Sequence, residues 1–420
     1  MSTPAWTAWR LAGTVRVKPG ALLLIGLGLV IVAGLGSSGN AELDTGFQLS
    51  AVTSSLQLGE IVVPVRAATL ACGAVVLAIG AYGAYALRGR RYPLPAVAAA
   101  TAAATVAFLC WAAGGSTINV SSLAAATVTG ALPLLLGALA GLLSERSGVI
   151  NVAIEGQFLL GAFAASVAAS LAGVWVGLVA GSLAGGLIGA MLALLAIRFL
   201  ADQVIVGIVL NLLVLGLTGF LFSRVVIPNQ DSLALPDTFD SLTVPGLAEL
   251  PIVGPALFDQ TVIPYLAVAL LVAVHVTLRH TRWGLRTLAV GESPEAADSA
   301  GVSVLKIRYW NVIVGGLAAG IGGVYLTIGS VGAFGPNISS GKGFIALAVL
   351  IFGGWNPGGA LVAALLFGFA DAVQSTLSII GSPIPTQLLQ MFPYLVTILA
   401  VAGLVGRVRP PAADGKPFVR

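Results

Sequence analysis

The stretch VWVGLVAGSLAGGLIGAMLALLAI, residues 174 to 197, decides the fold class of this 420-residue chain. It carries no charged side chain. It is also longer than the roughly 20 residues that a helix needs to cross a hydrocarbon core about 30 Å thick. Its apolar residues are continuous rather than alternating, which is typical of a membrane-spanning helix and not of a barrel strand. We therefore expect this stretch to cross a membrane as a helix.

The composition of the whole chain extends this prediction. Hydrophobic residues make up 58% of the chain and charged residues only 9%, against roughly 25% charged residues in an ordinary soluble domain. Further apolar runs occur at about 20–36, 61–87, 94–113, 121–143, 152–172, 203–222, 262–279, 308–331, 343–353, 358–376 and 388–405. The sequence thus predicts an all-α, polytopic integral membrane protein with about 10 to 12 transmembrane helices.

Two of these runs, within 343–376, are separated by the motif GGWNPGG. Glycine and proline inside a span are tolerated where the freed backbone groups face protein or a water-filled cavity. The region therefore indicates a broken or re-entrant helix.

The basic residues predict the orientation, because Lys and Arg accumulate in short cytoplasmic loops. With the N-terminus inside, all of the 20 basic residues except Arg66, Arg224 and Lys342 fall on the cytoplasmic side. The outer loop of about 223–261 is instead acidic and rich in proline. We expect both termini to be cytoplasmic, and the net charge of +4 is a topology signal rather than a sign of nucleic-acid binding.

Glycines recur at every fourth position at Gly181, Gly185 and Gly189, and again at Gly316 and Gly320. Small residues at this spacing let the backbones of membrane helices approach closely. We expect these glycines to pack helices rather than to take part in chemistry.

Enzyme chemistry has no support in the sequence. The stretch GPNISSGKGF lacks the first glycine and the Ser or Thr that a phosphate-binding loop requires. No GxSxG or HExxH motif occurs, and the two cysteines and two histidines form no ligand cluster. We therefore predict no catalytic residue, no metal site and no cofactor bound by this chain.

Ionisable residues within spans are costly and are candidates for function. Glu155 and Asp371 are such residues, and if the chain is helical from 149 onward Glu155 lies roughly 10 Å into the membrane at ~1.5 Å per residue. Asn151 would then lie one turn from Glu155 on the same face, as Gln374 does from Asp371. The full set of polar candidates for the translocation path is Asn151, Glu155, Gln157, Asn211, Asp371 and Gln374. They line a path for a polar solute, or they link neighbouring spans to one another; the sequence leaves both interpretations open.

The longest loop between spans on the predicted inner side, 279–308, is amphipathic. Ser293 is a candidate N-cap and Pro294 a candidate first residue of a short helix that Gly301 would end. Glu295 and Asp298 would lie in the first turn, where the helix dipole favours acids. Such a helix suits a soluble partner, although a solvated connector is the alternative.

Within this loop, the sequence EAADSAG, residues 295 to 301, resembles the EAA…G signature of bacterial ABC importer permeases. More widely, residues 121–405 resemble the branched-chain amino acid, ribose and nucleoside permease family, and within it the nucleoside and simple-sugar permeases. Four stretches carry the resemblance: ERSGVINVAIEGQFLLGAF, ADQVIVGIVLNLLVLGLTGFLF, TRWGLRTLAVGESPEAADSAG and GKGFIALAVLIFGGWNPGGALVAALLFGFADAVQ. Residues 1–120 lie outside it as a membrane leader with two or three spans, and 406–420 would be a cytoplasmic tail.

The resemblance implies a permease subunit that moves nucleosides across the bacterial cytoplasmic membrane by alternating access. Its implied protein partners are a second related permease, cytoplasmic ATP-binding subunits, and an extracytoplasmic substrate-binding lipoprotein or periplasmic protein. The ATP-binding subunits would hold ATP and Mg²⁺, and membrane lipid would surround the spans. The residues implied to couple it to the ATP-binding subunits are Gly291, Glu292, Pro294, Glu295, Ala296, Ala297 and Gly301.

Two alternatives remain. The first is a permease of the same family for ribose, another sugar or a branched-chain amino acid. The second is an ion-coupled secondary transporter, in which Glu155 and Asp371 would bind the coupling ion.

Overall fold

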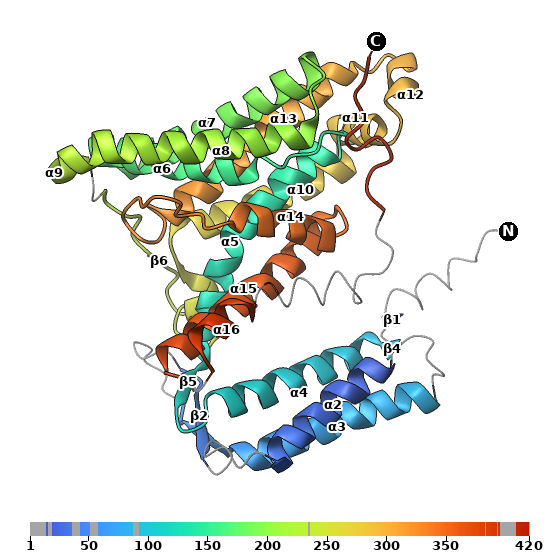
Figure 1. Cartoon of the computed structure of the whole chain (residues 1–420), viewed down its shortest axis with the longest axis vertical. Coiled ribbons are helices and arrows are strands. Elements are labelled where there is room, and N and C mark those ends of the chain that lie inside the picture. Colours follow the sequence, from blue (N-terminus) through green and yellow to red (C-terminus); the bar gives the residue numbers. More distant parts are fainter. Residues whose placement is uncertain are drawn as a thin grey trace. The chain divides into compact units, whose positions relative to one another are not determined.

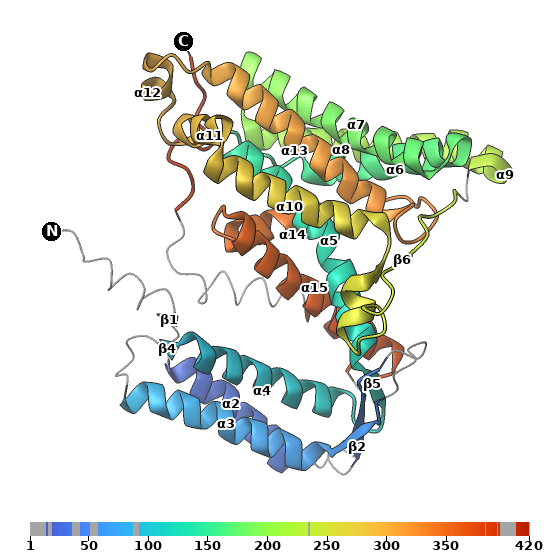
Figure 2. The same ribbon diagram turned by 180° about the vertical axis from the view of Figure 1, so that it is seen from behind.

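The computed structural model describes residues 14–15, 19–35, 43–50, 58–86, 92–233, 236–382, 384–392, 394 and 409–419. Helices dominate these residues (Figures 1 and 2). The chain divides into two compact units. The first contains Met1–Ala125, Glu249–Pro255 and Ala370–Gly406, and the second contains Ala126–Ala248, Ala256–Phe369 and Arg407–Arg420.

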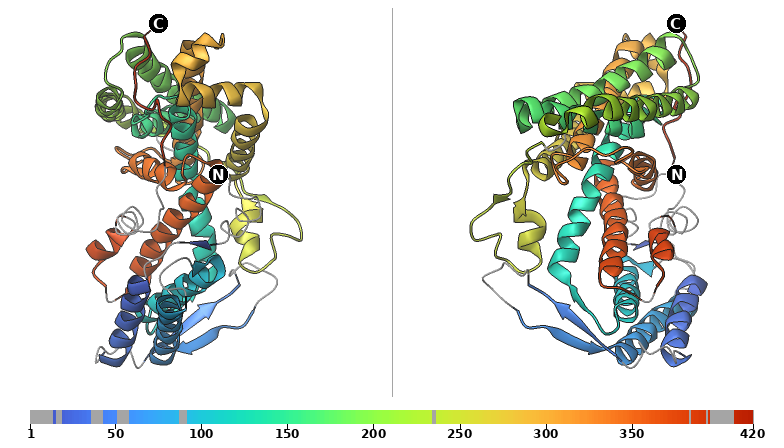
Figure 3. Two further views of the ribbon diagram at one scale, coloured as in Figure 1. Left: turned by 90° about the vertical axis from the view of Figure 1, so that its right-hand side faces the viewer. Right: turned by 60° about the vertical axis from the view of Figure 1, so that its left-hand side comes forward.

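The first unit contains three helices that pack side by side (Figure 3). They are α2 (Pro19–Leu35), α3 (Val65–Tyr85) and α4 (Leu94–Ala112). Glycine brings α2 and α3 close together, since a Cβ atom on Gly73 would lie only 3.0 Å from Val30 Cγ2. The short helix α16 (Thr386–Gln390) belongs to the same unit.

Short strands occur in both units. A three-stranded sheet has the order β3-β2-β5, in which β2 (Asp44–Gln48) is antiparallel to β3 (Ile61–Pro64) and parallel to β5 (Thr117–Asn119). The pairs β1 (Thr14–Val15) with β4 (Tyr92–Pro93), and β6 (Leu242–Thr243) with β7 (Asp259–Gln260), are antiparallel. Strands of two to five residues are too short to show the alternation that predicts a strand, so the sequence does not predict them.

The second unit is a bundle of long apolar helices. Its helices are α5 (Val120–Glu145), α6 (Ile154–Ala172), α7 (Val174–Ala193), α8 (Gln203–Leu221), α9 (Gln230–Leu233), α10 (Val262–His280), α11 (Arg282–Glu292), α12 (Pro294–Ser299), α13 (Val304–Leu326), α14 (Lys342–Phe352) and α15 (Pro357–Ile379). Helix α5 begins in the first unit, and α15 ends in it. Single turns of π-helix extend α7 at Leu194–Arg198 and α8 at Phe222–Val226. The core follows α5, where Leu136, Leu139 and Leu142 are fully buried.

The glycines predicted to pack helices allow α13 to lie directly against α7 (Figure 1). A Cβ atom on Gly185 would overlap Gly320 Cα and would lie 2.5 Å from Gly316 O. Real Cβ atoms do not approach other atoms so closely, so these helices would have to separate around any larger side chain.

The prediction of an all-α, polytopic membrane protein is confirmed. Among the described residues, nine helices are long and apolar enough to cross a membrane, and Leu22–Ile31 and Lys342–Phe352 are shorter apolar helices. The predicted break is also present, because α14 ends at Phe352 and α15 begins at Pro357. Most of the predicted span 388–405 lies outside the described residues, and the orientation of the termini stays a prediction.

Two local predictions were wrong. Helix α6 begins at Ile154 and not at 149, so Asn151 precedes the helix and is not one helical turn from Glu155.

Helix α12 does have Ser293 at its N-cap, Pro294 as its first residue and Glu295 in its first turn. However, Asp298 is next to the last residue of this six-residue helix, where the dipole no longer favours an acid.

Candidate functional site

A buried carboxylate joins the first turn of α6 to the first turn of α14. Glu155 is only 5% exposed. Its two oxygens accept hydrogen bonds from Ser339 Oγ at 2.5 Å, from Gly341 N at 2.9 Å and from Gly343 N at 2.7 Å. These donors come from the loop before α14 and from the beginning of that helix, 184 to 188 residues further along the chain.

Helix ends explain why an acid is stable in this place. The first N–H groups of a helix have no partner within the helix, and the helix dipole makes this end positive. Glu155 lies in the first turn of α6 and also accepts from the first turn of α14. Gly343 is required for the contact, because a Cβ atom there would lie 2.5 Å from Glu155 Cα. The site therefore has the form of a helix-terminus anion site that the chain fills with its own carboxylate.

The amides near Glu155 hold the chain where it enters α6. Asn151 Nδ2 donates to Gln157 Oε1 at 3.3 Å. Asn211 Oδ1 of α8 accepts from Gly156 N at 2.8 Å, and its Nδ2 donates to Val152 O at 2.9 Å. All three amide side chains are buried.

We call Asn151, Glu155, Gln157, Asn211 and Ser339 the polar cluster. The structure brings the first four together, as one group, at the N-terminal end of α6, and each of them bonds to other groups of the protein. This geometry favours the interpretation in which they link neighbouring spans. A role in lining the translocation path stays a prediction.

Asp371 and Gln374 lie one turn apart on α15, in the part of that helix that belongs to the first unit. Both side chains are half-buried, and Gln374 Nε2 donates to Ser378 Oγ at 3.4 Å. Their predicted role in the path remains to be tested.

A second polar junction holds the break between α14 and α15. Arg146, in the turn after α5, donates from Nε at 2.9 Å and from Nη2 at 2.7 Å to the carbonyl oxygen of Trp355. The Trp355 indole in turn donates to Glu145 Oε2 at 2.6 Å. Trp355 has φ 51°, a left-handed conformation that side chains other than glycine rarely adopt. The residues 145–155 thus hold α14 at both ends, through Glu155 at its beginning and Glu145 and Arg146 at its end.

The Arg146 backbone also contacts the predicted coupling loop 279–308 at Gly291. Burial lowers the pKa of Arg146, while the nearby charge of Glu292 raises it. Gly291 packs directly on the Arg146 backbone, since a Cβ atom at 291 would overlap the Arg146 carbonyl oxygen. A movement of the loop would therefore press on the turn that holds the helix break.

The structure divides the predicted coupling residues into two groups. Gly291, Pro294 and Ala297 are buried and anchor the loop on the rest of the unit. The exposed residues, which are free to contact another protein, are Glu292, Glu295, Ala296 and Gly301. Gly301 has φ 81°, which explains why glycine ends this short helix.

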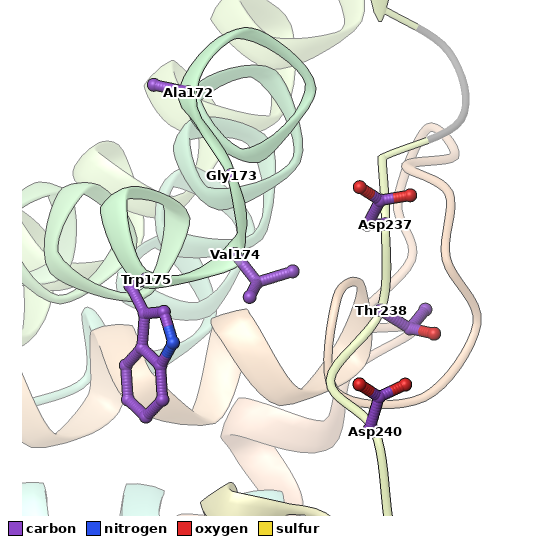
Figure 4. A pocket seen from close by; sticks show the side chains of 7 residues that line it. All are labelled: Ala172, Gly173, Val174, Trp175, Asp237, Thr238 and Asp240. Carbon is purple, nitrogen blue, oxygen red and sulfur yellow. The ribbon is translucent and has the colours of Figure 1, made fainter.

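A separate pocket of about 510 Å³ lies at the other end of α6. Figure 4 shows that Asp237, Thr238 and Asp240 line it from one extended segment, while Ala172 to Trp175 line it from the α6–α7 turn. Trp175 is held edge-on to the buried Phe239, with ring centroids 5.3 Å apart. Along α6 the pocket is about 25 Å from Glu155, at ~1.5 Å per residue. In the predicted orientation it faces the outside.

Sequence analysis missed several members of these sites. The stretch GPNISSGKGF predicts no phosphate-binding loop, yet it supplies Ser339, Gly341 and Gly343 as donors to Glu155. A glycine-rich turn before an apolar helix was the available signal for an anion site, but nothing local identifies Glu155 as the anion. The charge of Arg146 predicts only a cytoplasmic position, and the motif GGWNPGG that contains Trp355 predicts only a helix break.

Comparisons with known proteins show the family of this chain. The family model described as branched-chain amino acid transport system / permease component matches residues 123–401. The guanosine ABC transporter permease protein NupQ of Bacillus subtilis is 41% identical over 310 residues, which cover 70% of this chain and 95% of that protein. No match was found among solved structures.

Two further relatives have similar coverage. The nucleoside ABC transporter permease protein NupC of Lactococcus lactis is 34% identical over 302 residues, 69% of this chain and 93% of that protein. The putative glucose ABC transporter permease protein TsgC13 of Haloferax volcanii is 37% identical over 305 residues, 67% of this chain and 91% of that protein. The chain therefore belongs to the family of branched-chain amino acid transport system permease components, and it is a multi-pass membrane subunit of a transporter rather than an enzyme.

Proposed function

We propose that this chain forms part of the transmembrane path of an ATP-driven importer for nucleosides in a bacterial cytoplasmic membrane. The similarity to a guanosine permease and a nucleoside permease along nearly their whole lengths carries the proposal. The geometry agrees with it, because the EAA…G signature forms a short helix with Glu295 and Ala296 exposed at its surface.

In this proposal the ATP-binding subunits dock on α12 and hold ATP and Mg²⁺, which this chain does not bind. A second, related permease completes the path, and an extracytoplasmic substrate-binding protein delivers the nucleoside. Both termini and the coupling loop 279–308 lie in the cytoplasm. Closure of the ATP-binding subunits on ATP moves α11 and α12, and the contact of Gly291 with Arg146 passes this movement to the break between α14 and α15.

Uptake competition tests the substrate. The complete transporter is reconstituted in liposomes with ATP inside, and uptake of labelled guanosine is measured against excess uridine, glucose, ribose or leucine. The proposal predicts that uridine competes and that the other three do not. Competition by glucose or ribose would favour a sugar permease, for which the 37% identity to TsgC13 is the supporting observation.

The same liposomes separate an ATP-driven importer from an ion-coupled one. We expect uptake to require both the ATP-binding subunits and ATP and to persist when an uncoupler is present. Uptake by this chain alone, abolished by the uncoupler, would support the ion-coupled transporter instead.

Docking is tested with Ala296→Arg, which adds charge and bulk to the exposed face of α12 without changing the backbone conformation. This variant should lose the ATP-binding subunit on purification. Gly301 is a poorer choice, because its positive φ would strain any replacement. Ser330→Arg, which is exposed beyond the far end of α13, is the matched control and should retain the subunit. If the Ala296→Arg complex stays intact and transports normally, α12 is not the docking helix.

A further inference from the structure

The segment 409–419, with the sequence RPPAADGKPFV, lies against the coupling loop, and we call it the strap. Figures 1 and 2 show it as the dark red trace beside α11 and α12. Ala413 N donates to Gly291 O at 2.9 Å, at the end of α11. A Cβ atom on Gly291 would also lie 3.6 Å from Pro411 Cβ. The strap therefore contacts the same glycine that packs on Arg146.

One aromatic ring ties the strap to all three helices around the loop. Phe418 is 8% exposed and packs in a cluster with Val290 of α11, Ala297 of α12 and Val304 of α13. An aromatic ring buries a large apolar area, and a ring at the centre of such a cluster holds the surrounding backbones in one arrangement. Without it, these three aliphatic side chains of the coupling loop would lose an apolar neighbour.

A buried guanidinium gives the strap a second attachment. Arg308 is 1% exposed, and it donates from Nε to Ser147 O at 3.2 Å and from Nη1 to Lys416 O at 2.9 Å. Ser147 belongs to the turn between α5 and α6, so Arg308 links that turn to the strap. Burial raises the pKa of the nearby Asp414 to about 6, whereas the Gly415 N–H and the charge of Arg308 lower it.

The sequence of the strap suits this role. Proline fixes φ and reduces the conformational freedom that must be lost when a segment docks. The strap contains Pro410, Pro411 and Pro417, and hydrogen bonds from Asp414 N to Pro411 O and from Lys416 N to Ala413 O form two turns. It is a defined structure and not a solvated tail.

We propose that the strap positions the surface that receives the ATP-binding subunit, and that its Phe418 is a positioning residue that holds α11 and α12 in the docking arrangement. This inference rests on the proposed function. The exposed residues of α12 make the contact with the partner, and the strap determines their orientation.

The test compares three full-length variants in the complete transporter. Phe418→Ala removes the ring, Phe418→Leu retains apolar bulk, and Val419→Ala changes the neighbouring side chain, which is 74% exposed. We expect Phe418→Ala to lower the affinity for the ATP-binding subunit by about tenfold, the equivalent of about 1.4 kcal/mol. It should also lower the number of nucleosides transported per ATP hydrolysed, with the KM for nucleoside unchanged. Phe418→Leu should restore most of both, and Val419→Ala should match the wild type.

The outcomes are distinct. If Phe418→Ala binds the ATP-binding subunit and couples ATP hydrolysis to uptake as the wild type does, the strap has no part in docking. The affinity and the coupling of Phe418→Ala are measured well below its melting temperature. If both are unchanged and only the melting temperature is lower, the proposal is likewise overturned and Phe418 is a purely structural residue. If instead the wild-type chain fails to bind an ATP-binding subunit at all, the proposed function fails, whatever the variants do.

Discussion

The replacement Glu155→Gln tests the link between α6 and α14. The carboxylate accepts three hydrogen bonds, two of them from backbone N–H groups of the α14 N-terminus. A hydrogen bond to a charged group contributes about 1.5–3 kcal/mol. Glutamine has one acceptor oxygen in place of two, so at least one donor loses its partner and faces the amide nitrogen. We expect the first turn of α14 to lose about 2–3 kcal/mol of local stability.

Hydrogen exchange of the amides at 341–346, measured by mass spectrometry in the purified complex, reports this local stability. A loss of about 2–3 kcal/mol corresponds to exchange faster by roughly 30- to 150-fold. Ser340→Ala is the control, because the Ser340 side chain is exposed and donates only within its own loop, to Asn337 O. Exchange in this control should equal that of the wild type.

Transport by Glu155→Gln separates the two interpretations of the polar cluster. If Glu155 links spans, its replacement by glutamine lowers the maximal rate of transport, because α14 is then held less firmly. The KM for nucleoside stays unchanged in that case. Unchanged exchange at 341–346 together with a KM raised several-fold would refute the reasoning and make Glu155 a solute-binding residue.

Three further predictions concern packing, the helix break and pH. Gly185→Leu should destabilise the protein by about 1–3 kcal/mol in thermal unfolding through overlap with α13, whereas Gly216→Leu, with nothing within 4 Å of its Cβ position, should have little effect. Arg146→Lys cannot make both bonds to the Trp355 carbonyl oxygen, so a loss of about 1 kcal/mol and a lower transport rate are expected in the same assays. Because burial raises the pKa of Asp414 above its ordinary value, strap docking should be strongest below about pH 4 and weaken as pH rises through about 6. Hydrogen exchange of 409–419, corrected for its intrinsic pH dependence, should show this trend in the wild type and not in Asp414→Asn.

The sequence predicted the features that depend on neighbouring residues. Continuous apolar runs predicted the long helices, GGWNPGG predicted the break before α15, and Ser293 with Pro294 predicted the start of α12. Each signal is local, because composition, proline and capping act within a few residues.

The sequence could not predict contacts between distant segments. Glu155 was identified as an unusual acid in a span, but its donors are 184 to 188 residues away. Phe418 occurs in a polar, proline-rich segment that predicts only a tail, and its burial depends on three side chains from three helices. The sequence predicts too early a start for α6 because the residues at 149–153, apart from Asn151, are apolar, whereas hydrogen bonds to Asn211 and Gln203 hold this backbone in a nonhelical path.

The most direct test of the central claim is ATP-driven uptake of labelled guanosine into liposomes that contain this chain, its partner permease, the ATP-binding subunits and the substrate-binding protein. The account predicts accumulation that requires ATP, is competed by uridine and is lost in Ala296→Arg. Accumulation that needs no ATP-binding subunit, or that survives Ala296→Arg at the wild-type rate, would contradict it.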